Sequence, residues 1–127
     1  MAKRIINTKN APAAIGPYSQ AVAVGNMLFA SGQLPADPAT GEIKGDITEQ
    51  AEMSCKNVGA ILKENGMDFT NVVKTTCFLA DIADFAKFNE VYTKYFVGNP
   101  KPARSCVAVK DIPKGAKCEI EVIAMKD

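Results

Sequence analysis

The stretch Asp46–Gly66, DITEQAEMSCKNVGAILKENG, carries the clearest structural signal in the chain. Asp46 and Glu49, three residues apart, form the pattern of a capping box at a helix start, and Gly66 suits the left-handed conformation in which many helices end. Between these signals the apolar side chains recur at helical spacing, at Ile47, Ala51, Cys55, Val58 and Leu62. The stretch therefore predicts an amphipathic helix.

Working toward the carboxyl terminus, Asn71–Ala80 is rich in β-branched residues and predicts a strand. A second helix is expected over Ile82–Phe96, where aromatic side chains repeat with the helical period, and the Pro- and Gly-containing segment Gly98–Pro102 should break it. Two further strands are predicted, Ala103–Val109 and Lys117–Met125. The short DIPKGA segment between them suggests a hairpin connection.

Working toward the amino terminus, Leu34–Gly45 is dense in Pro, Gly and Asp and predicts an exposed loop. Before it, Ala21–Ser31 consists of two β-rich runs around a Gly-Asn turn, which indicates a hairpin, and Lys3–Asn7 suits a short edge strand. The resulting order, ββ(β)αβαββ, predicts one domain over residues 1–127. Its class is α+β, with two helices packed on one face of a mixed sheet.

The charge balance points away from polyanionic partners. The 127 residues include 15 basic and 14 acidic side chains, a net charge of +1, so neither nucleic acid nor a membrane surface is expected as a partner. The amino-terminal MAKRIINTKNAP lacks the apolar run of a secretory signal, and no stretch approaches the roughly 20 apolar residues of a membrane span. We therefore expect a cytoplasmic protein.

The residue types that are missing narrow the chemistry. The sequence contains no histidine, which excludes imidazole-based triads and His-ligated metals, and no glycine-rich phosphate-binding motif. Its cysteines are widely spaced without a CxxC pair, which argues against a zinc site and favours reduced, mostly buried thiols. We therefore expect no metal and no organic cofactor.

Arg104 is the most informative candidate for a site. It stands in KPARSCVAV, Lys101–Val109, at the start of an apolar strand whose alternation places Arg104 and Cys106 on one face. One interpretation is an ion pair with a glutamate of the last strand, closing the edge of the sheet. The other is a planar guanidinium fork that binds a ligand carboxylate. Strand spacing alone does not bring Arg104 close to Glu119.

Three further residues each allow a structural and a functional interpretation. Asn89 falls on the apolar face of the second predicted helix, where an amide either satisfies backbone groups or points into a site. Tyr18 follows Gly-Pro and is by default an anchored surface tyrosine. Cys106 is expected to be a packed thiol, because the chain has no histidine to activate it.

Several motifs resemble those of the RidA family, also called YjgF, in that family's order and over essentially the whole chain. They are GPYSQAV at Gly16–Val22, SGQ at Ser31–Gln33, FNEVY around Asn89, PARSCV at Pro102–Val107 and CEIEVIA at Cys118–Ala124. The resemblance implies a chorismate-mutase-like fold and a homotrimer with clefts between subunits. It also implies hydrolytic deamination of reactive enamino and imino acids to keto acids, without a cofactor.

The resemblance also implies roles for individual residues. Arg104 corresponds to the arginine that grips the substrate carboxylate, and Glu119 to the acid that positions the attacking water. The remaining matches line the family's pocket and are expected to bind substrate: Tyr18, Ser31, Gly32, Asn89 and Cys106. The same family suggests two alternatives, a ribonuclease that inhibits translation and a module that binds small ligands without turnover.

Overall fold

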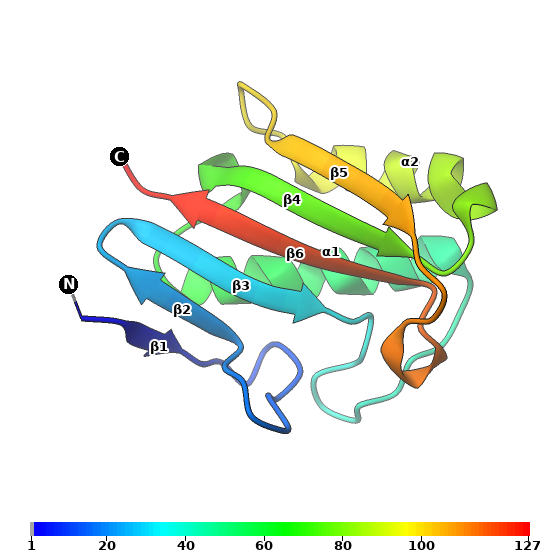
Figure 1. Cartoon of the computed structure of the whole chain (residues 1–127), viewed down its shortest axis with the longest axis horizontal. Helices are drawn as coiled ribbons and strands as arrows, with labels where there is room; N and C mark the ends of the chain where they lie inside the picture. Colours follow the sequence, from blue (N-terminus) through cyan, green and yellow to red (C-terminus); the bar gives the residue numbers. More distant parts are fainter. Residues whose placement is uncertain (1) are drawn as a thin grey trace.

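The carboxyl-terminal strand β6, Cys118–Met125, lies inside a six-stranded sheet ordered β1-β2-β3-β6-β4-β5 (Figure 1). The computed structural model describes residues 2–127. Along β6 the side chains alternate between buried and partly exposed, as expected for a strand with one face against a helical layer. The other strands are β1 Arg4–Ile6, β2 Ala21–Val24, β3 Met27–Gln33, β4 Val72–Leu79 and β5 Ala103–Ala108.

Helix α1, Ile47–Glu64, forms where the sequence predicted a helix. The Asp46 side chain accepts a hydrogen bond from the backbone N–H of Glu49, and the Glu49 side chain accepts one from the backbone N–H of Asp46. Gly66 has a φ of +68°, the left-handed conformation that ends the helix. The predicted apolar stripe is buried, so α1 packs on the sheet through that face.

Helix α2, Phe85–Tyr95, is shorter than the predicted segment. Its first residues instead form a 3₁₀ turn, Ile82–Asp84, because the Asp81 side chain accepts a hydrogen bond from the backbone N–H of Ala83. Phe88 and Val91 are buried beneath the helix. Both helices cover the same face of the sheet (Figure 1), which confirms the predicted α+β layering.

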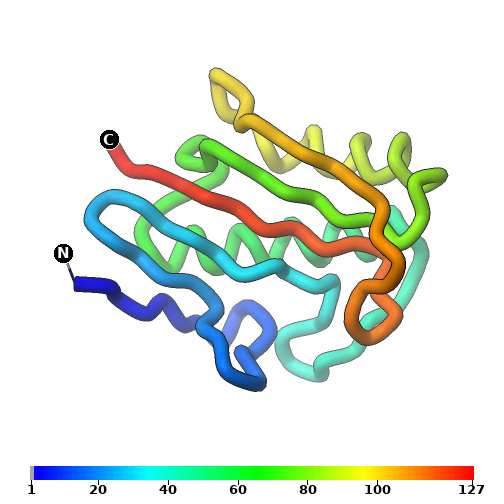
Figure 2. The backbone as a smooth tube through the Cα atoms, in the orientation of Figure 1, coloured from blue at the N-terminus to red at the C-terminus, as the bar shows by residue number. Residues whose placement is uncertain are grey.

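The predicted hairpin between the last two strands is wrong. Strand β5 pairs in parallel with β4, and β6 pairs antiparallel with β4 on its other side, so β4 separates the two. The physical reason is the crossover through α2, which returns the chain to the sheet in the direction of β4. The 3₁₀ turn Pro113–Gly115 then carries the chain past the end of β4 to β6, a path visible in Figure 2.

The sheet has a second face that neither α1 nor α2 covers. Its apolar side chains include Phe29 and Val107, each 45% exposed, and Ile5, which is 72% exposed. Register pairs Ile5 with Val22 and Val22 with Phe29, so these apolar groups lie in a row across neighbouring strands. We call this side the open face. Within residues 2–127, the helices lack the combination of length and apolar character that crossing a membrane requires.

Candidate functional site

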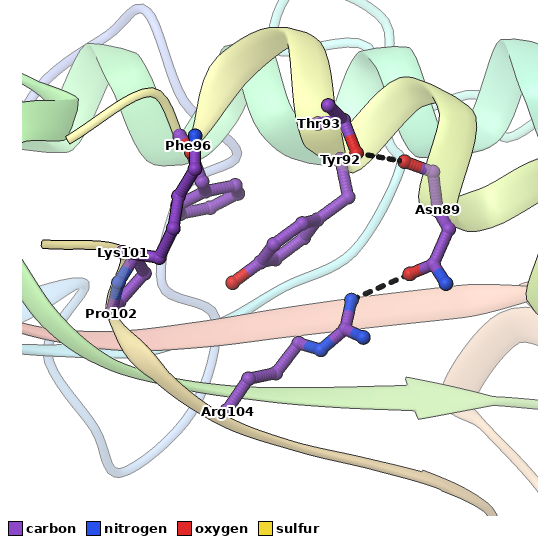
Figure 3. Close-up of a pocket in the computed structure, with 7 residues that line it drawn as sticks. All are labelled: Asn89, Tyr92, Thr93, Phe96, Lys101, Pro102 and Arg104. Carbon is purple, nitrogen blue, oxygen red and sulfur yellow. Dashed lines mark hydrogen bonds between the residues drawn. The ribbon is translucent and has the colours of Figure 1, made fainter. Parts of the chain in front are cut away.

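Arg104 lies on the helix-covered side of edge strand β5. It is in register with the buried Thr75 of β4, which fixes the face from which its side chain leaves the sheet. Its Nη1 donates a 2.6 Å hydrogen bond to Oδ1 of Asn89 on helix α2 (Figure 3). The amide of Asn89 thus orients the guanidinium and leaves its other N–H groups available to a ligand.

Tyr92 is a site residue that the sequence reasoning missed. The Arg104 guanidinium lies 4.7 Å from the centre of its ring, within the range of a cation–π interaction. The Tyr92 hydroxyl shares a 2.8 Å hydrogen bond with Oγ1 of Thr75, and burial raises the pKa of this phenol. The available signal was its position three residues after Asn89, on the same side of the helix.

A cavity of about 340 Å³ opens beside this cluster. It is lined by Asn89, Tyr92, Thr93, Phe96, Lys101, Pro102 and Arg104 (Figure 3). We call it the arginine cavity. The aromatic rings form apolar walls, and the lysine, the arginine and the asparagine amide supply hydrogen-bond donors. The lining includes no carboxylate. This composition suits a small organic anion.

Cys106 lies two residues beyond Arg104 on the same face, in register with Cys77. It is partly buried and packs against the hydrophobic core. Burial raises the pKa of the Cys106 thiol, although the nearby Arg104 charge acts in the opposite direction. A thiol with a raised pKa stays protonated near neutral pH, so the surroundings of Cys106 do not prepare it as a nucleophile.

The other predicted residues line a second cavity, of about 500 Å³. Tyr18, Ser31, Gly32 and Glu119 contribute to it, and we call it the glutamate cavity. Ser31 and Gly32 lie where the register between β3 and β6 shifts, in an irregularity of the β-bulge type. The Ser31 hydroxyl donates a 2.6 Å hydrogen bond to the carbonyl of Ser19, which ties the Tyr18 segment to β3.

Gly32 makes room for the Glu119 carboxylate. A Cβ atom built on Gly32 would lie 2.7 Å from Cδ of Glu119 and 3.0 Å from its Oε2. Burial, and secondly the negative charge of Glu121, raise the pKa of Glu119. Within residues 2–127 this carboxylate has no hydrogen-bonding side chain and no ion-pair partner. A carboxylate with a raised pKa and no such partner is chemically able to act as a base.

The two halves of the predicted site lie on opposite faces of one sheet. In the strand register, Arg104 of β5 pairs with Thr75 of β4, which in turn pairs with Val122 of β6. Thr75 and Val122 are buried beneath the helices. Glu119, three residues before Val122, belongs to the opposite face by the alternation of strand side chains. The hypothesis that Arg104 forms an ion pair with Glu119 inside one chain is therefore wrong.

Among residues 2–127 the structure shows no metal-binding arrangement of side chains. Within the part described, residues 2–127, no cluster of three or more Cys, Asp or Glu side chains is arranged to hold an ion. The cysteines are free, and all except Cys106 are fully buried. The arginine cavity presents a guanidinium held by Asn89, and the glutamate cavity presents a carboxylate with a raised pKa.

Comparison with known proteins gives matches over nearly the whole chain. Residues 8–126 match the family described as Endoribonuclease L-PSP. A RutC family protein of Pyrococcus abyssi is 54% identical over 128 residues, which cover 100% of both chains. The 2-iminobutanoate/2-iminopropanoate deaminase of Rattus norvegicus is 51% identical over 125 residues, covering 98% of this chain and 90% of the rat protein.

Solved structures share the fold. The YjgF gene product of E. coli is 47% identical and matches with a TM-score of 0.92, covering 98% of this chain and 99% of that one. The structure of E. coli TdcF with bound serine is 46% identical, with a TM-score of 0.91 and the same coverage of the two chains, 98% and 99%. Both likenesses include the strands and helices that carry the two cavities.

Proposed function

The chain belongs to the RidA (YjgF) family, and from that premise we propose that it hydrolyses 2-enamino and 2-imino acids, such as 2-aminoacrylate, to 2-keto acids and ammonia. Relatives of about half-identical sequence carry the name 2-iminobutanoate/2-iminopropanoate deaminase. The E. coli TdcF structure contains bound serine, a small molecule with the carboxylate and nitrogen that an imino acid also has. The rest of the proposal is argued from this chain's own residues.

The observation that carries the proposal is the oriented guanidinium of Arg104 at a small cavity without acidic residues. Asn89 and Tyr92 hold the guanidinium from two sides, so little side-chain freedom remains to be lost when an anion binds. A guanidinium binds a carboxylate through two parallel hydrogen bonds and stays charged at any working pH. Arg104 therefore suits the carboxylate of a 2-imino acid.

Glu119 supplies the base for the water. An enamine first tautomerises to the imine by gaining a proton on its β-carbon and losing one from nitrogen. The oxygen of a water molecule then bonds to the imine carbon while Glu119 accepts a proton, and the C=N electron pair moves to nitrogen. Glu119 then returns its proton to nitrogen and the hydroxyl proton follows it. The C–N bond breaks as the hydroxyl oxygen forms the keto C=O bond, and ammonia leaves. No electrons are exchanged, and positioning with one base is sufficient for such a reactive substrate.

The proposed assembly is a homotrimer with the site between subunits. Arg104 and Glu119 lie on opposite faces of one sheet, so a common site requires Arg104 from one copy and Glu119 from the next. The open face, with exposed Phe29 and Val107, supplies apolar surface for a neighbouring copy to cover. A closed ring of three copies would repeat the same junction three times.

The direct test is the Arg104→Ala variant, assayed for ammonia release while 2-aminoacrylate is generated in the same reaction. We expect a loss of at least 100-fold in kcat/KM, since the interaction that captures the carboxylate is gone. Arg104→Lys should restore little, because an ammonium lacks the planar fork. Activity of Arg104→Ala within twofold of the unmodified protein, with unfolding unchanged, would refute the proposal.

The family description also raises endoribonuclease activity as an alternative. The near-neutral net charge of +1 and the absence of histidine give no support to phosphodiester cleavage by this chain. A binding module without turnover is the other alternative. Ammonia release measured beside cleavage of a labelled RNA separates all three functions.

A further inference from the structure

The arginine cavity contains a second cation, Lys101. Its Nζ donates a 3.3 Å hydrogen bond to the backbone carbonyl of Phe96, a neutral acceptor, just as Arg104 donates to the neutral amide of Asn89. Among residues 2–127 the ion pairs join Lys44 to Glu42 and Lys94 to Glu52, so neither cavity cation takes part in one. A ligand with a single carboxylate would neutralise only one of the two charges.

The two cations lie on either side of an apolar wall. Figure 3 shows Lys101 extending toward Phe96 on one side of the Tyr92 ring, and Arg104 beneath the ring with its guanidinium directed to Asn89. Aromatic faces between two cations suit a ligand with a short hydrocarbon spacer between two anionic groups. The lysine side chain is flexible and its ammonium has three donors, so it can turn from a carbonyl to an anion.

We propose that Lys101 makes this site selective for dicarboxylic 2-imino acids, in which Arg104 holds the carboxylate next to the imine and Lys101 holds the carboxylate of the side chain. This inference rests on the proposed function and names the substrate class of the same site. The reaction is unchanged: water adds to the imine carbon, the C–N bond breaks, and the products are ammonia and a dicarboxylic 2-keto acid. The second carboxylate takes part only in binding.

Lys101 also has a purely structural explanation. Phe96 caps the carboxyl end of α2, where a lysine stabilises the exposed carbonyls and the negative end of the helix dipole. If this is its only role, Lys101→Met should lower the free energy of unfolding and leave the relative affinities for different ligands unchanged. The two explanations therefore differ in what Lys101→Met does to the ratio of two affinities.

Titration calorimetry with stable products tests the proposal without turnover. The ligands are 2-ketoglutarate, which has two carboxylates, and 2-ketobutyrate, which has one. We expect the full-length protein to bind 2-ketoglutarate at least tenfold more tightly at low salt, and Lys101→Met to reduce that ratio at least fivefold. Lys87→Met, which removes the same charge from an exposed position on α2, should leave the ratio unchanged.

Imine turnover provides the second measurement. An amino-acid oxidase generates the imines of glutamate and of 2-aminobutyrate in place, and the remaining imine is trapped with semicarbazide. We expect Lys101→Met to lower kcat/KM at least fivefold more for the dicarboxylic imine than for the monocarboxylic one. Equal effects on both substrates, or equal affinities for both keto acids in the unmodified protein, overturn the inference. Preferential binding of 2-ketoglutarate without turnover of any imine would instead refute the proposed function and retain the selectivity.

Discussion

At the scale of single residues, Glu119 lies beside a glycine and without a basic partner among the described residues. Gly32 lacks the Cβ that would occupy the position of the carboxylate, and no basic side chain of the described residues 2–127 pairs with it. Partial burial and Glu121 both favour the protonated form, which raises its pKa above the ordinary value of 4.5. The carboxylate is therefore a stronger base than an exposed glutamate.

The Glu119→Gln variant tests the role of this base. A carboxamide keeps the size of the side chain but cannot take a proton from water, so we expect kcat to fall by roughly 10² to 10³. Affinity for 2-ketobutyrate, measured by calorimetry, should change less than twofold because Arg104 still holds the carboxylate. Equal losses in rate and affinity would contradict the assignment.

The same residue predicts a pH dependence. Only the deprotonated Glu119 accepts a proton, so kcat/KM should fall as the pH drops through its pKa. Because that pKa is raised, the loss should begin above the pH expected for an ordinary glutamate, whose pKa is 4.5. The residual activity of Glu119→Gln should lack this acidic limb. A limb that persists unchanged in the variant would assign the titration to another group.

Gly32→Ala tests the space around the carboxylate. The added methyl would lie 2.7 Å from Cδ of Glu119, at the flexible end of that side chain, so the carboxylate should move while the fold remains. We expect at least a tenfold loss of kcat/KM, with a melting temperature changed by only about 2 to 4 °C. The aspartate of a Glu119→Asp variant is one methylene shorter. Adding Gly32→Ala to that variant should therefore lower kcat/KM by a smaller factor. Turnover of Gly32→Ala within twofold of the unmodified protein would refute this role.

At the scale of elements, α1 shows how local chemistry sets the limits of a helix. Its start depends on reciprocal hydrogen bonds between Asp46 and Glu49, and its end on the left-handed conformation of Gly66. Helix α2 has no such side-chain cap at its first residue, and the 3₁₀ turn before it takes the cap from Asp81 instead. A side-chain cap therefore sets the start of α1 directly, and that of α2 only through the 3₁₀ turn that Asp81 caps.

The Asp46→Ala variant should lose about 1 kcal/mol of unfolding free energy, because the backbone N–H of Glu49 loses the carboxylate that accepts its hydrogen bond. Urea denaturation followed by circular dichroism measures this loss, and Asp46→Asn should recover most of it. Asp111→Ala is the matched control, since Asp111 is an exposed aspartate of the loop between β5 and β6. A loss in the control as large as in Asp46→Ala would show that the capping hydrogen bonds are not the cause.

At the scale of the whole molecule, the separation of Arg104 from Glu119 is the decisive feature. The two side chains leave opposite faces of the sheet, and β4 lies between their strands. No rotamer change within one chain brings them together. The proposed trimer resolves this by pairing the two faces of neighbouring copies.

Co-expression of Arg104→Ala with Glu119→Gln tests the shared site. In a ring of three, each mixed trimer retains one site with both residues intact, so random assembly at equal levels should restore about a quarter of the unmodified activity. Light scattering at micromolar concentration should report a trimer. As a control, co-expression of Arg104→Ala with the double variant Arg104→Ala/Glu119→Gln should restore no activity, because no copy then supplies Arg104. No recovery from the first pair in confirmed mixed trimers, or a stable monomer, would refute a site between subunits.

The sequence by itself determined the features that depend on neighbours along the chain. The capping box at Asp46, the helical period that follows it and the β-rich runs on either side predicted both helices and the strands, within a few residues of their observed ends. Strand alternation also placed Arg104 and Cys106 on one face, as the register with Thr75 and Cys77 now shows. These signals are local because hydrogen bonds and side-chain direction are set by adjacent residues.

Only the tertiary structure decided which strands are neighbours and which faces the site residues share. The DIPKGA segment resembles a hairpin loop locally, yet β4 lies between the strands that it connects, because the α2 crossover sets β5 parallel to β4. The contact of Arg104 with Tyr92 and the space that Gly32 leaves for Glu119 likewise join segments far apart in sequence. Such pairings depend on how all the apolar faces are buried together, a global balance that no local stretch encodes.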